Sequence, residues 1–303
     1  MLLALCLSLA VSALAAGSSP PSWAPDHRST EGSRRITHVW AVRHGQAWHN
    51  LDRQNGWRLP DPGLTALGWE QATAAAGLLP HNLSLLISSP LRRCVQTTAA
   101  ALTALGAPPP AAASGRRVPL VLHPDLQEIY YGPADTGRPW PDLLAEFGDS
   151  SRPDEGSSEG AVPLPCWAQL DDRVLRERPE WYLEKERLPS EQSVRKKPGR
   201  QAFARRQAQR FLGWLSSTSS WDGNDDGQCG LGPEDARADE SESSGSERSV
   251  LIAGHNGALS ALLPPDPTAQ PAEGDKPPGL RNGEVVRLAL EITATQCFWE
   301  RLP

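Results

Sequence analysis

Residues 36–45 read ITHVWAVRHG, and this stretch decides the fold. The part from Ile36 to Val42 is mostly apolar or β-branched, which is typical of a strand buried on both faces. The run ends abruptly at Arg43, His44 and Gly45, where two polar side chains and a glycine indicate a loop. The stretch therefore predicts a core strand whose carboxyl end presents a histidine.

Strands and helices alternate after this first strand. An Ala-rich helix is predicted from Thr65, its N-cap, to about Leu79, and the apolar run LSLLISSP at residues 83–90 predicts a second strand. A helix over residues 91–105 and a strand over residues 118–122 follow. This alternation indicates parallel pairing, and so predicts an α/β fold: a three-layer sandwich with a mainly parallel central sheet.

The second half of the chain has weaker patterns. Residues 142–147 and 167–181 are predicted as short helices, and residues 200–215 as a longer helix with one apolar side. Strands are expected at residues 250–253 and 284–292. These elements continue the same mixed architecture.

The chain of 303 residues is long enough for one large domain, which we assign to residues 36–303. Two segments inside it have little to bury: residues 221–249 are rich in Gly, Ser and acidic side chains, and residues 264–279 are rich in Pro. Both compositions predict disordered insertions. Residues 17–35, rich in Ser, Pro and charge, are predicted to form a disordered leader.

Charge argues against a nucleic-acid partner. There are 30 basic and 36 acidic residues, giving a net charge of −6, and no run of Lys or Arg could neutralise a phosphate backbone. Residues 221–249 carry nine acidic and two basic residues, so the rest of the chain is close to neutral. Small anions remain compatible with such a surface. The composition alone assigns no function to the 11 tryptophans.

The first 16 residues, MLLALCLSLAVSALAA, are apolar and end in small residues. This pattern predicts a signal peptide, with Ala13–Ala15 as an A-x-A cleavage pattern, and hence a secreted protein or one of the secretory pathway. The alternative is an apolar N-terminal extension on a cytoplasmic protein. We expect no integral membrane segment after cleavage, because the apolar run is shorter than a membrane span. The sequon Asn82–Ser84 is compatible with secretion.

Chemically useful side chains stand at the ends of several predicted strands. Two strands end in glycine-flanked histidines, His44 and His255, and a third is followed by Arg92 and Arg93. In open α/β sheets, ligands bind beyond the carboxyl ends of the strands. Arginine offers planar pairs of donors, and glycine lets backbone N–H groups approach a ligand. The sequence therefore predicts a phosphate site at this edge.

Four motifs occur in a fixed order: Arg43–Asn50 (RHGQAWHN), Asp61–Gly68 (DPGLTALG), Ser89–Thr97 (SPLRRCVQT) and Ala253–Gly257 (AGHNG). The first three match R-H-G-[EQ]-x-x-x-N, D-x-x-L-T-x-x-G and S-P-L-x-R-x-x-Q-T, and the fourth stands where a late [SA]-H-G is expected. In these motifs the chain resembles branch 1 of the histidine phosphatase superfamily, the phosphoglycerate mutase-like proteins. The resemblance runs from about residue 36 to residue 290, interrupted by the insertions.

The resemblance implies roles for individual residues. His44 corresponds to the nucleophile, whose neutral imidazole attacks phosphorus and forms a phosphohistidine. Arg43, Arg93 and His255 would surround the transferring phosphoryl group, and Asn50 would add a donor. With the charge neutralised in this way, neither a metal ion nor a cofactor is expected.

A leaving alkoxide needs a proton, and two carboxyl groups compete to supply it. The segment Leu126–Gly132 (LQEIYYG) is similar to the family's L-x-E-x-x-x-G, which implies Glu128. Asp135 is the alternative, because it opens a D-T-G segment that resembles fungal and algal phosphoglycerate mutase family proteins. We favour Glu128.

Some positions depart from the family patterns. The second branch has R-H-G-x-R-x-P and a late H-D, whereas this chain has Ala47 and Asn256 at the decisive positions. The late G-H-N-G in place of S-H-G leaves the backbone donors beside His255 undefined. Cys94 is either oxidation-sensitive or a small packed residue, and we favour packing. The histidines form no H-E-x-x-H motif, and there is no C-x-x-C, so a zinc site is a poor rival.

The sequence thus predicts a metal-independent phosphomonoester hydrolase that acts on a small phosphorylated substrate through a phosphohistidine on His44. One alternative is a phosphoglycerate mutase-type phosphotransferase, which uses the same residues but keeps its phosphohistidine from water. The other is a catalytically inactive module that binds phosphate.

Overall fold

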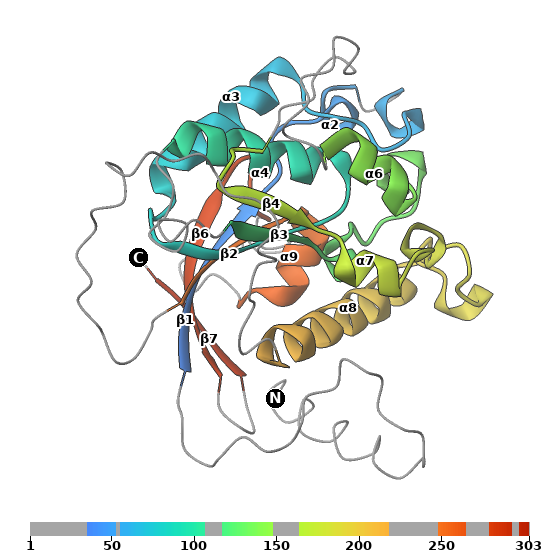
Figure 1. Ribbon diagram of the computed structural model, residues 1–303. Coiled ribbons are helices and arrows are strands. Elements are labelled where there is room, and N and C mark those ends of the chain that lie inside the picture. The colour runs from blue at the N-terminus through green and yellow to red at the C-terminus, as the bar shows by residue number, and fades with distance from the viewer. Residues whose placement is uncertain are drawn as a thin grey trace, which may run out of the picture. The chain divides into compact units, whose positions relative to one another are not determined.

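A computed structural model describes residues 35–52, 55–106, 117–147, 164–217, 248–264, 279–292 and 297–302 (Figure 1). The predicted signal peptide, the leader up to residue 34 and most of the two predicted insertions lie outside the described residues. Strand β1 begins at Arg35 and strand β5 at Arg248, so regular structure starts slightly earlier at both places than the sequence predicts.

The described strands form one sheet in the order β4-β3-β2-β5-β1-β6-β7 (Figure 1). Their bounds are β1 Arg35–Arg43, β2 Leu83–Ser88, β3 Val118–Leu122, β4 Ala168–Asp171, β5 Arg248–Gly254, β6 Val285–Ile292 and β7 Cys297–Arg301. The strands from β4 to β1 run parallel, and β6 and β7 are antiparallel at one edge. The predicted mainly parallel sheet is confirmed, with β7 as an addition.

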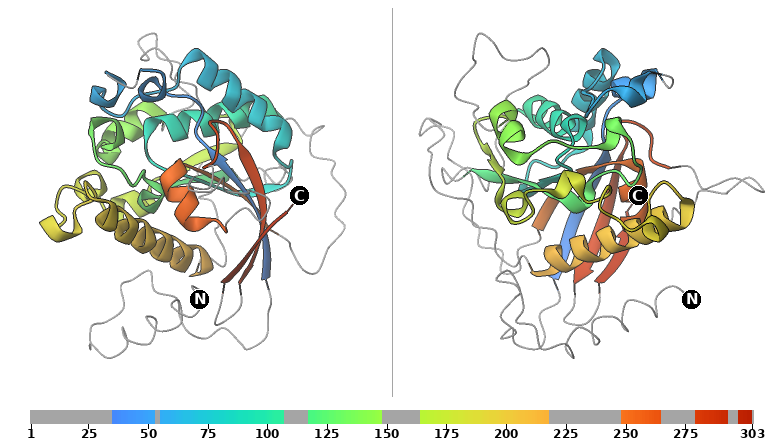
Figure 2. Two further views of the ribbon diagram at one scale, coloured as in Figure 1. Left: turned by 180° about the vertical axis from the view of Figure 1, so that it is seen from behind. Right: turned by 90° about the vertical axis from the view of Figure 1, so that its right-hand side faces the viewer.

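Helices cover both faces of this sheet, which confirms the predicted three-layer sandwich (Figure 2). Their bounds are α2 Trp48–Leu51, α3 Ala66–Ala75, α4 Arg92–Leu105, α6 Trp140–Phe147, α7 Arg173–Glu177, α8 Lys197–Ser217 and α9 Asn256–Leu262. Helices α3, α4 and α6 pack on one face, and α8 and α9 on the other. Within the described residues, no helix is long and apolar enough to cross a bilayer.

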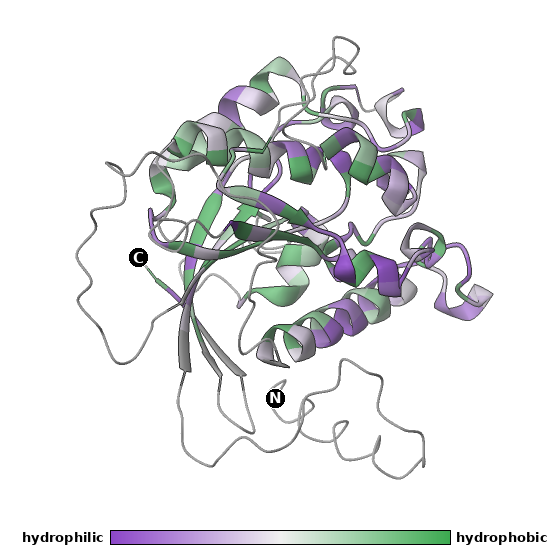
Figure 3. Ribbon diagram, viewed as in Figure 1, coloured by the Kyte–Doolittle hydropathy of each residue, from purple (hydrophilic) through white to green (hydrophobic). Residues whose placement is uncertain are grey.

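Strand β1 lies at the centre of the core because both of its faces are apolar. Trp40 and Val42 pack into the cluster under α3 and α4, and Val39 and Ala41 into the cluster under α8 and α9. Burying a side chain of this size contributes about 1.5–3 kcal/mol. The hydropathy colouring shows apolar residues along the central strands (Figure 3). This burial fixes the strand that ends at the candidate site.

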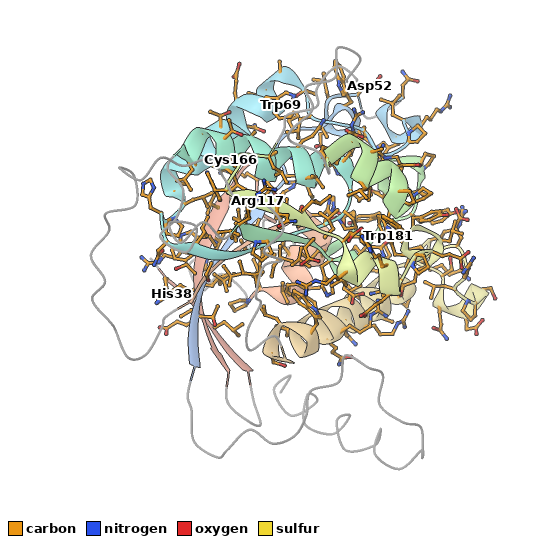
Figure 4. The ribbon with its side chains drawn as sticks, viewed as in Figure 1. His38, Asp52, Trp69, Arg117, Cys166 and Trp181 are labelled. Carbon is orange, nitrogen blue, oxygen red and sulfur yellow. The ribbon has the colours of Figure 1, made fainter. Side chains whose placement is uncertain are left out.

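The structure corrects one predicted helix, residues 167–181. Residues Ala168–Asp171 form β4, which extends the parallel sheet beside β3, and only Arg173–Glu177 is helical. Trp167 and Trp181 are each 2% exposed, so both indoles belong to the core. Trp181 is labelled in Figure 4. Pairing with β3 outweighs the local helical pattern, because tertiary context overrides intrinsic propensity.

Candidate active site

The two predicted site histidines meet at the carboxyl edge of the parallel strands. β1 and β5 are neighbours with Arg43 in register with Gly254, so His44 and His255 leave the sheet side by side. The backbone N–H of His44 donates to the carbonyl of Gly254 at 3.0 Å. The two imidazole centroids lie 5.0 Å apart. We call residues 43–45, 89–97 and 254–257 the histidine edge.

His44 is held as a neutral imidazole with one available nitrogen. It is 1% exposed, and its Nδ1 lies 2.7 Å from the carbonyl oxygen of Gly45. Because a carbonyl oxygen only accepts hydrogen bonds, Nδ1 carries the proton and Nε2 keeps its lone pair. Burial lowers the pKa of His44 well below its usual value, and the charges of Arg93 and Arg43 lower it further. Nε2 is therefore a nucleophile at neutral pH.

The loop that carries His44 is clamped between two other predicted motifs. The backbone N–H of Gly45 donates to Oγ1 of Thr97, in α4, at 3.0 Å. A Cβ on Gly45 would lie 2.3 Å from the carbonyl oxygen of Gly68, and a Cβ on Gly68 would lie 2.0 Å from that of Gln46. Only glycine allows this approach of the two backbones. The first two motifs thus share one tight contact.

Asp61, from the second motif, positions the start of α4. It is 2% exposed, and its Oδ1 accepts the backbone N–H of Arg92 at 2.9 Å. Arg138 pairs with its other oxygen at 3.1 Å. The φ of 41° at Asp61 is in the left-handed region that few residues other than Gly, Asn and Asp adopt. The helix that carries Arg93 is therefore fixed from outside as well as from the core.

Two guanidinium groups with unused donors stand at the site. Arg93 is fully buried, and it donates to the carbonyl of Ala134 and to Oδ1 of Asp135, both at 2.7 Å. Arg43 donates through Nη1 to the carbonyl of Leu280 at 2.6 Å. Nε of each arginine is buried without a hydrogen-bond partner in the described part of the chain. An unpaired buried donor costs about 1–3 kcal/mol, so both groups suit an anionic ligand.

His255 lies between Ser89, Arg93 and Cys94. Its Nδ1 is 3.2 Å from Nη2 of Arg93, which can only donate, so Nδ1 accepts and Nε2 donates to Oγ of Ser89 at 2.9 Å. Burial, followed by the charge of Arg93, lowers the pKa of His255 well below its usual value. Sγ of Cys94 lies 3.3 Å from Nε2, and burial raises the pKa of this thiol. Cys94 has the surroundings of a packed thiol rather than a reactive thiolate.

Both candidate proton donors lie in residues 123–138, which we call the acid segment. Glu128 is 7% exposed, and its described hydrogen bonds come from the backbone N–H groups of Ile129 at 2.7 Å and Gly257 at 3.5 Å. Burial, and then the charge of Asp135, raises the pKa of Glu128. Asp135 instead forms a fully buried ion pair with Arg93. The two carboxyl groups thus have different contacts: one suits a general acid and the other orients an arginine.

Lys185 fastens the acid segment to the core. It follows η6 (Trp181–Leu183) and is 4% exposed. Its Nζ donates to the carbonyls of Glu128 at 3.1 Å and Tyr130 at 2.9 Å, and to that of Asp135. An ammonium has three donors, so these carbonyls use all of them. Burial lowers the pKa of Lys185 to about 8.

Asn50 is tied to the nucleophile through a residue far along the chain. Its Oδ1 accepts the backbone N–H of Ala47 at 3.1 Å and lies 3.4 Å from Nδ2 of Asn282. The same Nδ2 of Asn282 donates to the carbonyl of His44 at 3.0 Å. Nδ2 of Asn50 lies 3.0 Å from Nε2 of His49. Asn50 therefore belongs to the surroundings of His44, as the first motif predicts.

Four residues of this arrangement are not predicted from the sequence: Ser89, His49, Lys185 and Asn282. Ser89 and His49 stand inside matched motifs, so their position in the sequence could have indicated that they lie at the site. Lys185 and Asn282 come from irregular segments with no periodicity. Among the described residues, no group of three or more His, Cys, Asp or Glu side chains is placed to hold a metal ion. The positive charges at the site suit an anionic ligand.

Comparison with known proteins places part of the chain in a family. The family model described as histidine phosphatase superfamily (branch 1) matches residues 39–187. This segment holds His44, Arg93 and both candidate acids, whereas His255 and Asn282 lie beyond it.

Two bacterial proteins are similar over shorter stretches. The adenosylcobalamin/alpha-ribazole phosphatase of Escherichia coli is 33% identical over 96 residues, which is 31% of this chain and 41% of that protein. A bifunctional protein of Mycobacterium tuberculosis is 38% identical over 98 residues, which is 32% of this chain and 24% of that protein. The chain thus spans between a quarter and two fifths of the length of these curated relatives.

A solved structure, the ecdysone phosphate phosphatase of Bombix mori in complex with tungstate, aligns with a TM-score of 0.43 and 16% identity. The alignment covers 88% of this chain and 92% of that one. The similarity to fungal and algal proteins stays a prediction. Residues 39–187, just under half of the chain, thus match the histidine phosphatase superfamily, branch 1.

Proposed function

We propose that the protein is a phosphomonoester hydrolase that acts through a phosphohistidine on His44 and needs no metal ion. One observation carries the proposal: a buried, neutral His44 stands beside Arg43 and Arg93, each of which keeps a buried N–H with no partner among the residues that the structure describes. A phosphate ester brings oxygens for these donors and a phosphorus atom for the nucleophile.

In the first step, Nε2 of His44 attacks phosphorus in line, and the bond from phosphorus to the ester oxygen breaks. Arg43, Arg93 and Asn50 donate to the equatorial oxygens, where charge develops. His255 lies beside them, and its Nδ1 accepts from Nη2 of Arg93 and so helps to orient that guanidinium. Glu128, whose pKa is raised by burial, gives its proton to the leaving alkoxide.

In the second step, the carboxylate of Glu128 takes a proton from water. The water oxygen attacks phosphorus, the bond from phosphorus to Nε2 breaks, and its electron pair returns to the imidazole of His44. Inorganic phosphate leaves, and Glu128 is again protonated. The expected partner is a small phosphorylated molecule rather than a nucleic acid.

We also propose that the protein enters the secretory pathway. The apolar sequence Met1–Ala16 supports this, and so does the disulfide bond of Cys166, because disulfides persist in oxidising compartments. Expression in a secreting host and N-terminal sequencing of the exported protein test it. Retention of Met1–Ala16 on a protein that stays in the cell would contradict it.

His44→Ala tests the proposed hydrolase. We expect it to lower the turnover of 4-nitrophenyl phosphate by about 10⁴-fold or more, because the nucleophile is lost. His81→Ala, at an exposed position before β2, is the matched control and should leave turnover unchanged. Acid quench of the wild type during turnover should trap phosphate that is stable to base and labile to acid.

Three outcomes would contradict the proposal. Retained turnover in His44→Ala would show that His44 is not the nucleophile. Isomerisation of 3-phosphoglycerate, with its bisphosphate primer, that outpaces phosphate release would indicate a mutase. Tight phosphate binding without turnover by the wild type would indicate a binding module.

A further inference from the structure

The exposed large apolar side chains are unevenly distributed. Among the described residues, seven such side chains are at least 40% exposed, and four of them fall within residues 48–59, just after the His44 loop. These four are Trp48, Leu51, Trp57 and Leu59, which we call the apolar rim. Large exposed apolar groups that lie together are typical of ligand or partner sites.

The apolar rim is connected to the nucleophile by ring contacts. The ring of Trp57 meets that of His49 edge-on at 5.2 Å, and His49 lies 5.7 Å from His44, centroid to centroid. Gly56 permits this arrangement, because a Cβ there would lie 2.5 Å from Cα of His49. The short helix η2 (Gly56–Arg58) therefore packs directly on α2. A ligand bound at His44 has Trp57 within reach.

His49 supplies a polar group at the inner end of this row. It is 4% exposed, and Nδ2 of Asn50 donates to its Nε2, so the proton is on Nδ1. That Nδ1 is buried without a partner among the described residues. Burial, with Arg93 and Arg43, lowers the pKa of His49 to about 3, so the ring is neutral. A neutral N–H donor suits an ester or hydroxyl oxygen.

The apolar rim also borders the acid segment. η2 packs against η5 (Pro133–Asp135), and the backbone N–H of Asp61 donates to the carbonyl of Pro133 at 3.2 Å. Glu128 lies in that segment, and the leaving group must approach this residue to receive its proton. Tyr130, two residues further on, is 40% exposed. The segment that holds Glu128 therefore borders the part of the chain where Trp57 is exposed.

We propose that the apolar rim binds the leaving group of the substrate and that this group is aromatic or otherwise apolar. The proposal rests on the hydrolase activity proposed above. Covering exposed indole rings with an apolar group is favourable, and aromatic pairs add to the gain from burial. A strongly hydrated leaving group would lose its water without regaining hydrogen bonds from Leu51 or Leu59. The substrate class is thus an apolar phosphomonoester.

Trp57→Ala, assayed on two substrates, tests this assignment. We expect kcat/KM for 1-naphthyl phosphate to fall about 10-fold or more, mainly through KM, and kcat/KM for glycerol 2-phosphate to change less than about 3-fold. Each variant is compared with the wild type on one substrate at a time, so the intrinsic reactivity of the leaving group cancels. Trp57→Phe keeps a ring and should restore most of the loss.

Leu78→Ala is the matched control, because Leu78 is 61% exposed but lies before β2, at the end of the sheet opposite His44. This variant should leave kcat/KM unchanged for both substrates. If Trp57→Ala does not fold, Trp48→Ala replaces it with the same expectation. An equal decrease in kcat/KM for both substrates, or no decrease, would overturn the rim assignment but would not contradict the proposed hydrolase activity. A wild type that hydrolyses neither substrate would instead contradict the hydrolase.

A second copy of the chain is the competing occupant of the apolar rim. Sedimentation of the wild type and of Trp57→Ala separates the two cases. A monomer in both supports the substrate assignment. A dimer that Trp57→Ala dissociates would overturn it, because the rim would then be covered by protein.

Discussion

The histidine edge and the acid segment contribute to one site, but they are held in place by different means. His44 and His255 follow adjacent parallel strands, and the register of β1 and β5 sets their separation. The acid segment has only two short 3-10 turns, η4 (Pro124–Leu126) and η5, and side chains hold it, chiefly Lys185. His44 is thus positioned by the sheet and Glu128 by a few polar contacts, so variants should affect them separately.

The largest expected effect separates the two carboxyl groups of the acid segment. Glu128→Gln should slow the phosphorylation of His44 by an alkyl phosphate about 10²–10⁴-fold, and much less by 4-nitrophenyl phosphate, which needs no proton on its leaving group. Asp135→Asn should weaken phosphate binding with both substrates, because it releases Arg93. Rapid-quench kinetics measure both effects. A leaving-group dependence in Asp135→Asn alone would exchange the two roles.

The same experiment has a pH signature. In the proposed mechanism Glu128 acts as an acid in the first step, so the phosphorylation rate should fall as the pH rises through its raised pKa. Glu128→Gln should lack this decrease. A decrease that persists in Glu128→Gln would assign the proton to another group.

Lys185→Met tests whether the position of the acid segment depends on the hydrogen bonds of Lys185. Three carbonyls lose their donor, so we expect a lower melting temperature and a decrease in kcat of about 10–100-fold, because a small displacement of a catalytic group is costly. Lys197→Met, at an exposed position, is the control and should change neither. A lower melting temperature with an unchanged kcat and pH profile would make Lys185 purely structural.

The smallest effect concerns the stability of the acid segment at low pH. His123 is 2% exposed against Phe211, and burial lowers its pKa to about 4. In the unfolded chain His123 binds a proton below about pH 6.5, whereas in the folded chain it binds one only below about pH 4. The free energy of unfolding therefore falls by about 1.4 kcal/mol per pH unit in this window.

His123→Asn removes this contribution while keeping an acceptor for the N–H of Asp125. At pH 7 the variant should be less stable than the wild type, and the difference should shrink by about 3 kcal/mol on acidification to pH 4. Urea unfolding at both pH values measures it. A constant difference would show that the pKa of His123 is the same in the folded and unfolded chains.

The same comparison explains what the sequence could predict. A central strand that ends in a histidine has a strong local pattern, so β1, β2 and the positions of His44 and Arg93 follow from residue types and spacing. The correction at residues 167–181 arises because β4 exists only through its pairing with β3. Lys185 and Asn282 act on backbone carbonyls far along the chain, and no local pattern records such contacts. The apolar rim could not be predicted from the composition, because only the structure shows which tryptophans are exposed and which are buried.

The contacts of the His44 loop with residues 280–284 have a consequence for protein synthesis. The backbone N–H of Gly283 donates to the carbonyl of Arg43 at 3.1 Å, and the N–H of Arg43 donates to that of Glu284 at 3.1 Å. A nascent chain carries His44 early, but the backbone partners of the His44 loop are translated more than two hundred residues later. Domains fold as units as they emerge from the ribosome. Chains that end before this segment therefore lack the contacts that fix the His44 loop, so the geometry around His44 can form only after residues 280–284 have been made.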